Sequence, residues 1–332
     1  MINSFPFLVV TFIAILGFEA VNGWTDAPNA VATVVSTRVL APIPAVAMAA
    51  LFNLLGALSG TAVAATVGKG IVNINEINLE TIVSACAAVI VWSTFAWYFG
   101  LPTSKTHEIL AGLAGAGVAR KGFGVLEYSG WEKVFTGLGA AVVFGALGGV
   151  ILMLLLTWLL RRSSPSFVQR TFGVLQLGSA AFMAWSHGTA DGQKAMGVMA
   201  MALAIHYHPG EAATSFSVPI WVILLAATTM GVSTGLGGYR IIRTLGMRLT
   251  HLQPVHGFAA ETAAAMTITV SARFGVPLST THTIGSAIMG VGATRRFSAV
   301  RWGIAQEILL AWVLTFPVCF TLGFVIALIV PG

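Results

Sequence analysis

The sequence predicts an all-α polytopic membrane protein, built as an inverted-topology repeat with broken helices and about 10–12 membrane segments. Three observations support this fold class. Hydrophobic residues make up 57% of the 332-residue chain and charged residues only 8%, unlike a soluble domain. The apolar residues form ten runs separated by short polar or basic joints, five in each half. A pair of polar motifs also occurs once in each half.

The ten apolar runs are the expected membrane elements. In chain order they cover 5–37, 43–67, 80–100, 103–118, 133–160, 171–205, 218–238, 250–273, 278–294 and 302–330. The first and sixth runs are too long for one straight span. Both contain glycine beside an aspartate, and the first also contains a proline, so we expect helix breaks at 23–28 and 188–192.

The fourth and ninth runs, 103–118 and 278–294, begin with Pro-x-Ser and are either full spans or re-entrant hairpins. Neither alternative changes the repeat. We expect residues 1–332 to form a single transmembrane domain, with 1–160 as the first inverted repeat and 171–332 as the second.

Loop charges indicate the orientation. The loops 161–170, 239–250 and 294–302 each carry a net charge of +3, whereas 68–80 carries −1 and 119–133 carries +1. Basic loops stay in the cytoplasm, so the two weakly charged loops and both termini are expected outside. Counterpart loops of the two halves then face opposite sides, which is typical of an inverted repeat.

The composition also limits the partners. The formal net charge is +6, but the basic residues form small clusters between apolar runs, so we expect the lipid bilayer of the cell membrane as the partner and no nucleic acid. Cys86 and Cys319 both lie inside apolar runs and do not indicate a disulfide framework.

The first repeated motif is Gly-x-x-Asp, which ends at Asp26 and at Asp191. A lone carboxylate at membrane depth has to face a cavity, a partner or a bound cation. We therefore predict that both aspartates couple transport to a cation, as ligands of Na⁺ or as acceptors of H⁺. The alternative is that each aspartate caps a helix.

The second repeated motif is Pro-x-Ser-x-Thr-His, at 102–107 and at 277–282, and each copy opens a new apolar helix. Free backbone N–H groups at a helix N-terminus favour an anion. Two such ends that meet across a pseudo-two-fold axis would suit a tetrahedral oxyanion, although the hydroxyls could also be simple helix caps. These hydroxyls belong to Ser104, Thr106, Ser279 and Thr281.

Three further polar residues have less certain roles. His107 and His282 either contact an anion or relay a proton, or else hydrogen-bond within their own helices. Glu261 lies before the second Ser-Thr motif and is a candidate for a cation site.

Two lysines lie beside the motifs. Lys194 follows Asp191 by three residues, at the position that Asn29 occupies in the first copy. It either forms an ion pair with the aspartate or contacts an anion directly. Lys105 has Glu108 at the same spacing and leaves the same two alternatives open.

On these motifs the chain resembles the inorganic phosphate transporter (PiT/Pho4) family, from Gly23 through the last apolar run. The matching segments include 29–33, 187–188, 193–197 and 277–282. The resemblance implies an inverted repeat, a homodimer, and symport of inorganic phosphate with Na⁺ or H⁺. No other cofactor and no enzymatic activity are implied.

The resemblance also implies site residues. Carried over by position, the cation and substrate centre would contain Asp26, Asn29, Asp191 and Gln193. The phosphate would be held by Ser104, Thr106, Ser279, Thr280 and Thr281.

The chain departs from the family pattern at four positions. Thr25 and Ala190 precede the aspartates, where the family commonly has Asn or His. Lys105 and Glu108 replace a small hydroxyl residue and an uncharged one. Sulfate or another tetrahedral oxyanion is therefore an alternative substrate. Two more distant alternatives are a passive anion channel, which paired carboxylates would disfavour, and an intramembrane aspartyl enzyme.

Overall fold

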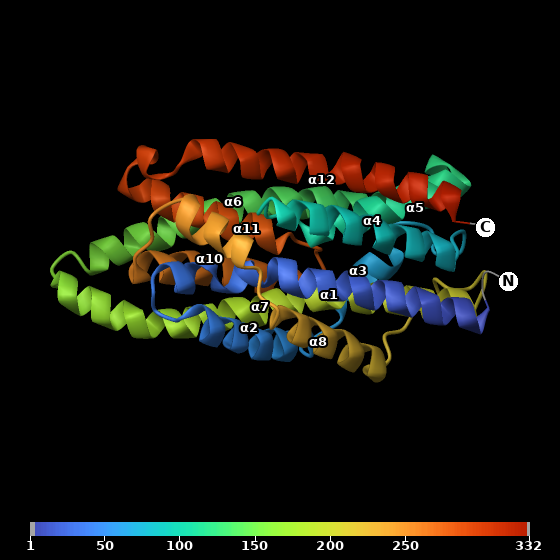
Figure 1. Cartoon of the computed structure of the whole chain (residues 1–332), viewed down its shortest axis with the longest axis horizontal. Coiled ribbons are helices and arrows are strands. Elements are labelled where there is room, and N and C mark those ends of the chain that lie inside the picture. Colours follow the sequence, from blue (N-terminus) through green and yellow to red (C-terminus); the bar gives the residue numbers. More distant parts are fainter. Residues whose placement is uncertain (1–3, 331–332) are drawn as a thin grey trace.

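The computed structural model describes residues 4–330, and its architecture is a bundle of helices (Figure 1). The first half contains α1 (Phe5–Ser36), α2 (Pro42–Ala57), α3 (Ala62–Lys69), α4 (Leu79–Tyr98), α5 (Lys105–Lys121) and α6 (Tyr128–Leu159). The second half contains α7 (Pro165–Tyr207), α8 (Ile220–Thr234), α9 (Tyr239–Ile242), a π-helical turn (Arg243–Arg248), α10 (Pro254–Arg273), α11 (Thr280–Arg295) and α12 (Trp302–Ile329). These elements confirm the all-α prediction.

Both halves have the same order of elements: a long helix, a bent pair, two medium helices and a long helix. The α2–α3 pair bends by 75°, and the counterpart pair, α8 with Tyr239–Arg248, bends by 65°. Figure 1 shows that α1 begins, and its counterpart α7 ends, at the end of the molecule where both termini lie. Counterpart helices thus run in opposite directions, as an inverted topology requires.

The positions predicted for the helix breaks were wrong. Helices α1 and α7 are continuous through both aspartate motifs, and the breaks lie instead at 58–61 and 235–238. Pro28 removes one backbone donor from α1, yet the helix continues past it. Gly188 allows close packing, because a Cβ there would lie only 2.1 Å from the carbonyl oxygen of Asn53 on α2.

The loop predicted at 239–250 was also partly wrong, since Tyr239–Arg248 is helical. This segment completes the bent span that begins with α8. The sequence did not show this part of the span, because its three arginines interrupt the apolar run within ten residues.

The helices α5 and α11 are arms of re-entrant hairpins, which decides between the two alternatives for 103–118 and 278–294. Full spans in an inverted repeat would begin on opposite membrane surfaces, about 30 Å apart. Instead the two starts touch: Thr106 Oγ1 donates to the carbonyl of Leu278 (3.1 Å), and Thr281 Oγ1 donates to the carbonyl of Thr103 (3.0 Å). Both hairpins therefore end at a common depth inside the molecule.

The two halves are interleaved. Helix α5 packs along α12, and α11 packs along α6, so each hairpin lies against the last helix of the other half. Glycines allow this contact: a Cβ at Gly115 would lie 2.0 Å from the carbonyl oxygen of Phe320, and one at Gly290 would lie 2.3 Å from that of Ala146. Small residues of this kind let membrane helices approach closely.

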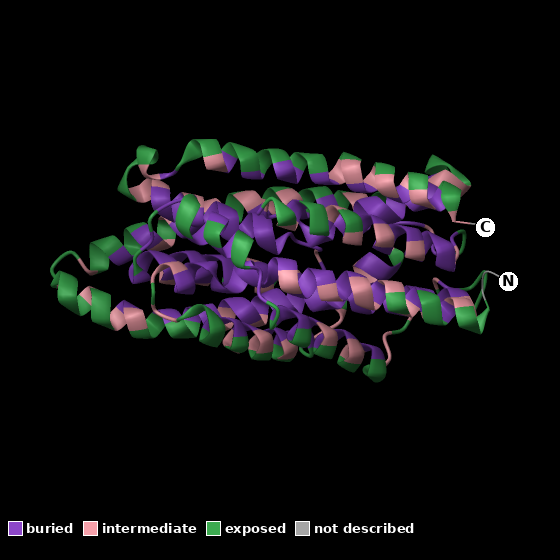
Figure 2. Cartoon of the chain, in the orientation of Figure 1, coloured by how far each residue is buried: buried purple, intermediate pink, exposed green. Residues whose placement is uncertain are grey.

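Exposed residues lie on the outside of the bundle and buried residues in its interior (Figure 2). Many of the exposed residues are large and apolar, and the interior is partly polar. Large apolar side chains such as Ile151 and Val313 are 64% and 70% exposed, whereas several charged side chains are fully buried. Within residues 4–330, helices α1, α4, α6 and α12 are each long and apolar enough to cross a membrane, and up to six segments qualify if each bent pair is one span. Lipid is the solvent that suits this surface.

The strongly basic loops gather at one end of the molecule. The backbone N–H of Arg301 donates to the carbonyl of Leu249 (3.0 Å), which joins the loops 239–250 and 294–302. In Figure 1 the loops 161–170 and 294–302 lie at the end opposite the termini. The segregation agrees with the predicted sidedness.

Candidate functional site

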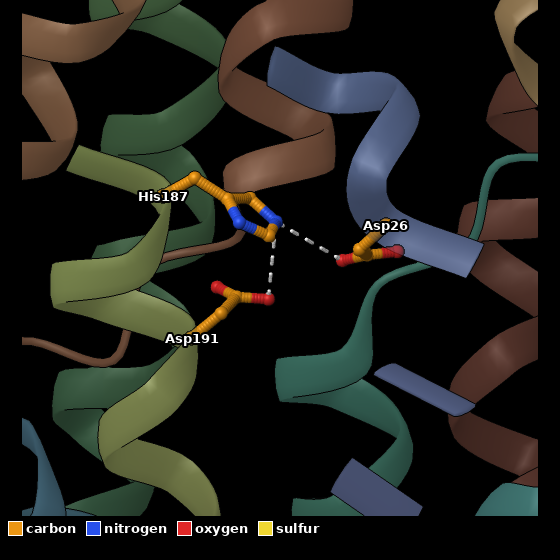
Figure 3. A group of neighbouring side chains, drawn as sticks. All are labelled: Asp26, His187 and Asp191. Atoms are coloured by element: carbon orange, nitrogen blue, oxygen red, sulfur yellow. Dashed lines mark ion pairs between the residues drawn. The ribbon is translucent and has the colours of Figure 1, made fainter. Parts of the chain in front are cut away.

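The two motif aspartates face each other in the interior (Figure 3). Asp26 comes from α1 and Asp191 from α7, and both lie well inside their helices, so neither is a helix cap. His187 of α7 lies between them, with Nε2 at 3.9 Å from Asp26 Oδ2 and 3.7 Å from Asp191 Oδ2. All three side chains are buried. Ligand atoms of this trio lie within 4.8 Å of one another, close enough to share a cation.

Each aspartate is paired with a buried lysine. Lys194 Nζ lies 2.7 Å from Asp191 Oδ1. Lys105 Nζ lies 2.9 Å from Glu108 Oε1 and 3.8 Å from Asp26 Oδ1. Both lysines therefore form ion pairs, and the contact between Lys105 and Asp26 links the first hairpin to α1.

Several polar atoms of this cluster are buried without a hydrogen bond to residues 4–330. They are Asp26 Oδ2, Asp191 Oδ2 and His187 Nε2. Buried polar atoms are nearly always hydrogen-bonded. Atoms in this state at one place indicate that the cluster receives a polar or charged ligand.

The hairpin tips lie against the aspartate cluster. Asn29, one turn after Asp26, donates from Nδ2 to Thr281 Oγ1 at 3.0 Å. Ser104 Oγ accepts from the backbone N–H of His107 (3.3 Å), and Ser279 Oγ accepts from that of His282 (3.2 Å). Both serines are thus N-caps, and two helix N-termini meet beside the carboxylates. Thr280, also buried, is the first residue of α11.

Comparison with known proteins identifies the family. The sequence profile of the phosphate transporter family (PHO4) matches twice, at residues 22–169 and 161–323. The chain belongs to the phosphate transporter family. It is 42% identical to a probable low-affinity inorganic phosphate transporter of Rhizobium meliloti (strain 1021), over 95% of this chain and 93% of that protein. It is 37% identical to a protein of the same description from Bacillus subtilis (strain 168), over 95% and 94% of the two chains.

A solved structure described as "The sodium-dependent phosphate transporter" superposes with a TM-score of 0.88, over 97% of this chain and 98% of that chain. The sequences are 21% identical, so this likeness shows the fold alone. The family and the fold together identify this protein as a multi-pass cell membrane protein. The family consists of transporters, as the sequence predicted, and not of enzymes.

The sequence did not lead us to expect His187 at the site. It precedes Asp191 by four residues, and on a continuous helix that spacing places both side chains on one face. The expected break at Gly188 hid this relation. Asn53 of α2 orients the imidazole, since its Oδ1 lies 3.0 Å from His187 Nδ1.

The two motif histidines lie side by side at the hairpin tips, with their rings tilted by 56°. Their ring centroids lie 4.8 Å apart. His282 Nδ1 is hydrogen-bonded to Ser279 Oγ in the same helix, and its ring lies against Trp312 at 3.7 Å. His107 stacks on Phe316 at 4.5 Å. Of the alternatives considered for His282, the hydrogen bond within its own helix is therefore present.

Gln193 contacts a helix terminus in this structure. Its Oε1 accepts from the backbone N–H groups of Val63 (2.7 Å) and Ala64 (3.3 Å), and its Nε2 donates to the carbonyl of Thr189 (2.7 Å). The amide therefore caps α3, on the far side of the bend in its span.

Glu261 lies in a separate buried cluster. Its carboxylate accepts from Thr33 Oγ1 (2.5 Å), from Gln176 Nε2 (3.1 Å) and from Ser179 Oγ. These donors join α1, α7 and α10. Neither aspartate of the central trio contacts this carboxylate among the described ion pairs and hydrogen bonds.

Proposed function

We propose that this protein is a secondary active symporter that carries inorganic phosphate across the cell membrane, coupled to Na⁺ or H⁺. One observation carries the proposal: Asp26 contacts Lys105 at the tip of the first hairpin, and Asn29, one turn after Asp26, donates to Thr281 at the tip of the second. A cation at Asp26 and Asp191 and an anion at the hairpin tips would then be neighbours. Each charge lowers the free energy of binding the other, which is the basis of symport.

The anion site consists of two opposed helix N-termini lined with hydroxyls, a set of donors that suits a tetrahedral oxyanion. We assign the hydroxyls to Ser104, Thr106, Ser279, Thr280 and Thr281, which are all buried. Phosphate is the substrate in the names of the relatives from Rhizobium meliloti and Bacillus subtilis. Sulfate uses the same geometry and is the substrate to be tested against it.

The transport cycle follows from the repeat. We assign residues 1–160 and 171–332 to the two inverted repeats of one transmembrane domain, which is supported by the two separate matches to the family profile. Rocking of one repeat against the other would expose the central site to alternate sides. A passive anion channel is the alternative, and accumulation of phosphate against a gradient separates a symporter from it.

The test is uptake of radiolabelled phosphate into proteoliposomes under an imposed Na⁺ gradient or an imposed H⁺ gradient. We expect one gradient to drive accumulation, excess unlabelled sulfate to have little effect, and Asp191→Asn to abolish coupled uptake. Full suppression by sulfate would reassign the substrate. Uptake that never exceeds equilibration would favour the channel, and unchanged coupled uptake by Asp191→Asn would remove the cation assignment.

The family resemblance also implies a homodimer, which we retain as part of the proposal. Light scattering coupled to size-exclusion chromatography of the detergent-solubilised protein measures the mass directly. A protein mass of one chain, 34.6 kDa, would contradict the dimer.

A further inference from the structure

We propose that Lys105 and Lys194 are built-in counter-cations of the coupling centre, so that phosphate uptake by this protein does not require Na⁺. The inference rests on the proposed function and concerns its coupling ion. Of the two ions considered above, it excludes Na⁺ as a requirement. It also assigns that property to two specific side chains.

The first argument is position. Lys194 Nζ lies 2.7 Å from Asp191 Oδ1, and Lys105 Nζ lies 3.8 Å from Asp26 Oδ1. A sodium ion bound by these carboxylates would lie within a few ångströms of an ammonium group. Like charges at that separation repel strongly in a buried, weakly polarisable interior. The ammonium groups therefore occupy the electrostatic role that a bound cation would have.

The second argument is the internal repeat. Lys194 corresponds to Asn29 in the first copy of its motif, and Lys105 corresponds to Thr280 in the second copy. Neither lysine recurs at its counterpart position. Each aspartate nevertheless receives one lysine, Asp191 from its own helix and Asp26 from the tip of the first hairpin. The two halves share a lysine beside the aspartate, although Lys105 also pairs with Glu108, at 2.9 Å, and is therefore shared between two carboxylates.

The third argument is burial. Lys105 and Lys194 are each 1% exposed, and both are among the largest fully buried side chains of the described structure. A lysine is almost never fully buried unless it is paired, because its charge loses hydration. Neutral asparagine and threonine fit the equivalent places in the other repeat, so packing alone does not demand a lysine here.

The experiment uses the variants Lys194→Asn and Lys105→Thr, each of which installs the residue of the other repeat. Lys121→Thr, an exposed lysine in the last turn of α5, is the matched control. Phosphate uptake into proteoliposomes is compared in sodium medium and in choline medium of equal ionic strength. We expect equal uptake in both media for the unmodified protein and for Lys121→Thr. For the two test variants we expect a loss of about tenfold in choline that sodium restores.

A second measurement does not depend on transport. Thermal unfolding of the purified proteins is followed in NaCl and in choline chloride, since an ion that binds only the folded state raises the unfolding temperature. We expect Na⁺ to raise it for the two test variants and not for the unmodified protein.

The outcomes separate the two proposals. Phosphate uptake by the unmodified protein that depends on Na⁺, or Na⁺-specific stabilisation of it, would overturn the inference. So would test variants that take up phosphate normally in choline, or that neither transport nor gain stability with Na⁺. No phosphate uptake by the unmodified protein in either medium, under either gradient, would instead overturn the proposed function on which the inference rests.

Discussion

The side chain of Gln193 shows how one residue can stabilise a helix other than its own. The first backbone N–H groups of a helix have no partner within that helix. In α3 the N-cap residue, Thr61, makes no side-chain cap bond with the described chain. Gln193 supplies the missing acceptor to Val63 and Ala64 from α7. A residue carried over as a substrate or cation contact therefore also has a structural task in this conformation.

Replacement of Gln193 by alanine should destabilise the protein. The change leaves the buried N–H of Val63 and Ala64 without their side-chain acceptor, which costs about 1–3 kcal/mol. Thermal unfolding in detergent should show a lower transition temperature. Gln169→Ala, at an exposed position on the same helix, should leave the transition unchanged. Equal stability of the two variants would show that the cap contributes nothing.

At the scale of elements, the contact between each hairpin and the last helix of the other half depends on glycine. Helices α5 and α12 approach so closely that a Cβ at Gly115 would lie 2.0 Å from the carbonyl oxygen of Phe320. A backbone oxygen cannot move aside as a flexible side chain can. Small residues are the usual solution where lipid-embedded helices pack tightly.

Gly115→Ala should therefore separate α5 from α12 and destabilise the protein by about 1–3 kcal/mol through overpacking. The matched control is Gly139→Ala on α6, where a Cβ would meet nothing within 4 Å among the described residues. Alanine favours a helix more than glycine does, so the control should be neutral or slightly stabilising. Thermal unfolding of both variants checks the pair, and equal transitions would contradict the packing argument.

At the scale of the whole molecule, charge segregation sets the orientation in the membrane. The loops 161–170 and 294–302 lie at one end, where Leu249 also contacts Arg301, and the termini lie at the other (Figure 1). Basic loops remain on the cytoplasmic side. The central site, by contrast, is formed by elements of both halves, so neither half contains it alone.

The orientation can be tested by labelling single cysteines with a membrane-impermeant maleimide. Ser298→Cys lies among the basic loops and Ser129→Cys lies at the opposite end, and both positions are exposed. We expect Ser129→Cys to react in right-side-out vesicles and Ser298→Cys only after permeabilisation. The native Cys86 and Cys319 are buried and should give little background. The reverse labelling pattern would invert the assigned topology.

Much of this protein was determined by the sequence itself. The ten apolar runs correspond to helices or bent pairs, because a membrane segment must satisfy its own backbone and therefore shows itself in local hydropathy. The duplicated motifs identified both aspartates and both capped hairpin starts. The sequence suggested that two such helix N-termini, if they met, would suit an oxyanion, and in the structure they do meet.

Only the tertiary structure decided the remaining features. Whether a glycine breaks a helix or allows another helix to pack closely depends on the helix beside it. The helix breaks therefore lie away from the predicted positions. Because α7 is continuous, His187 lies between the two aspartates. The lysine of Asp26 comes from a hairpin tip 79 positions further along the chain. Local patterns record which residues prefer lipid or water. Packing alone determines which buried charges come within reach of one another, because those contacts join segments that are distant in sequence.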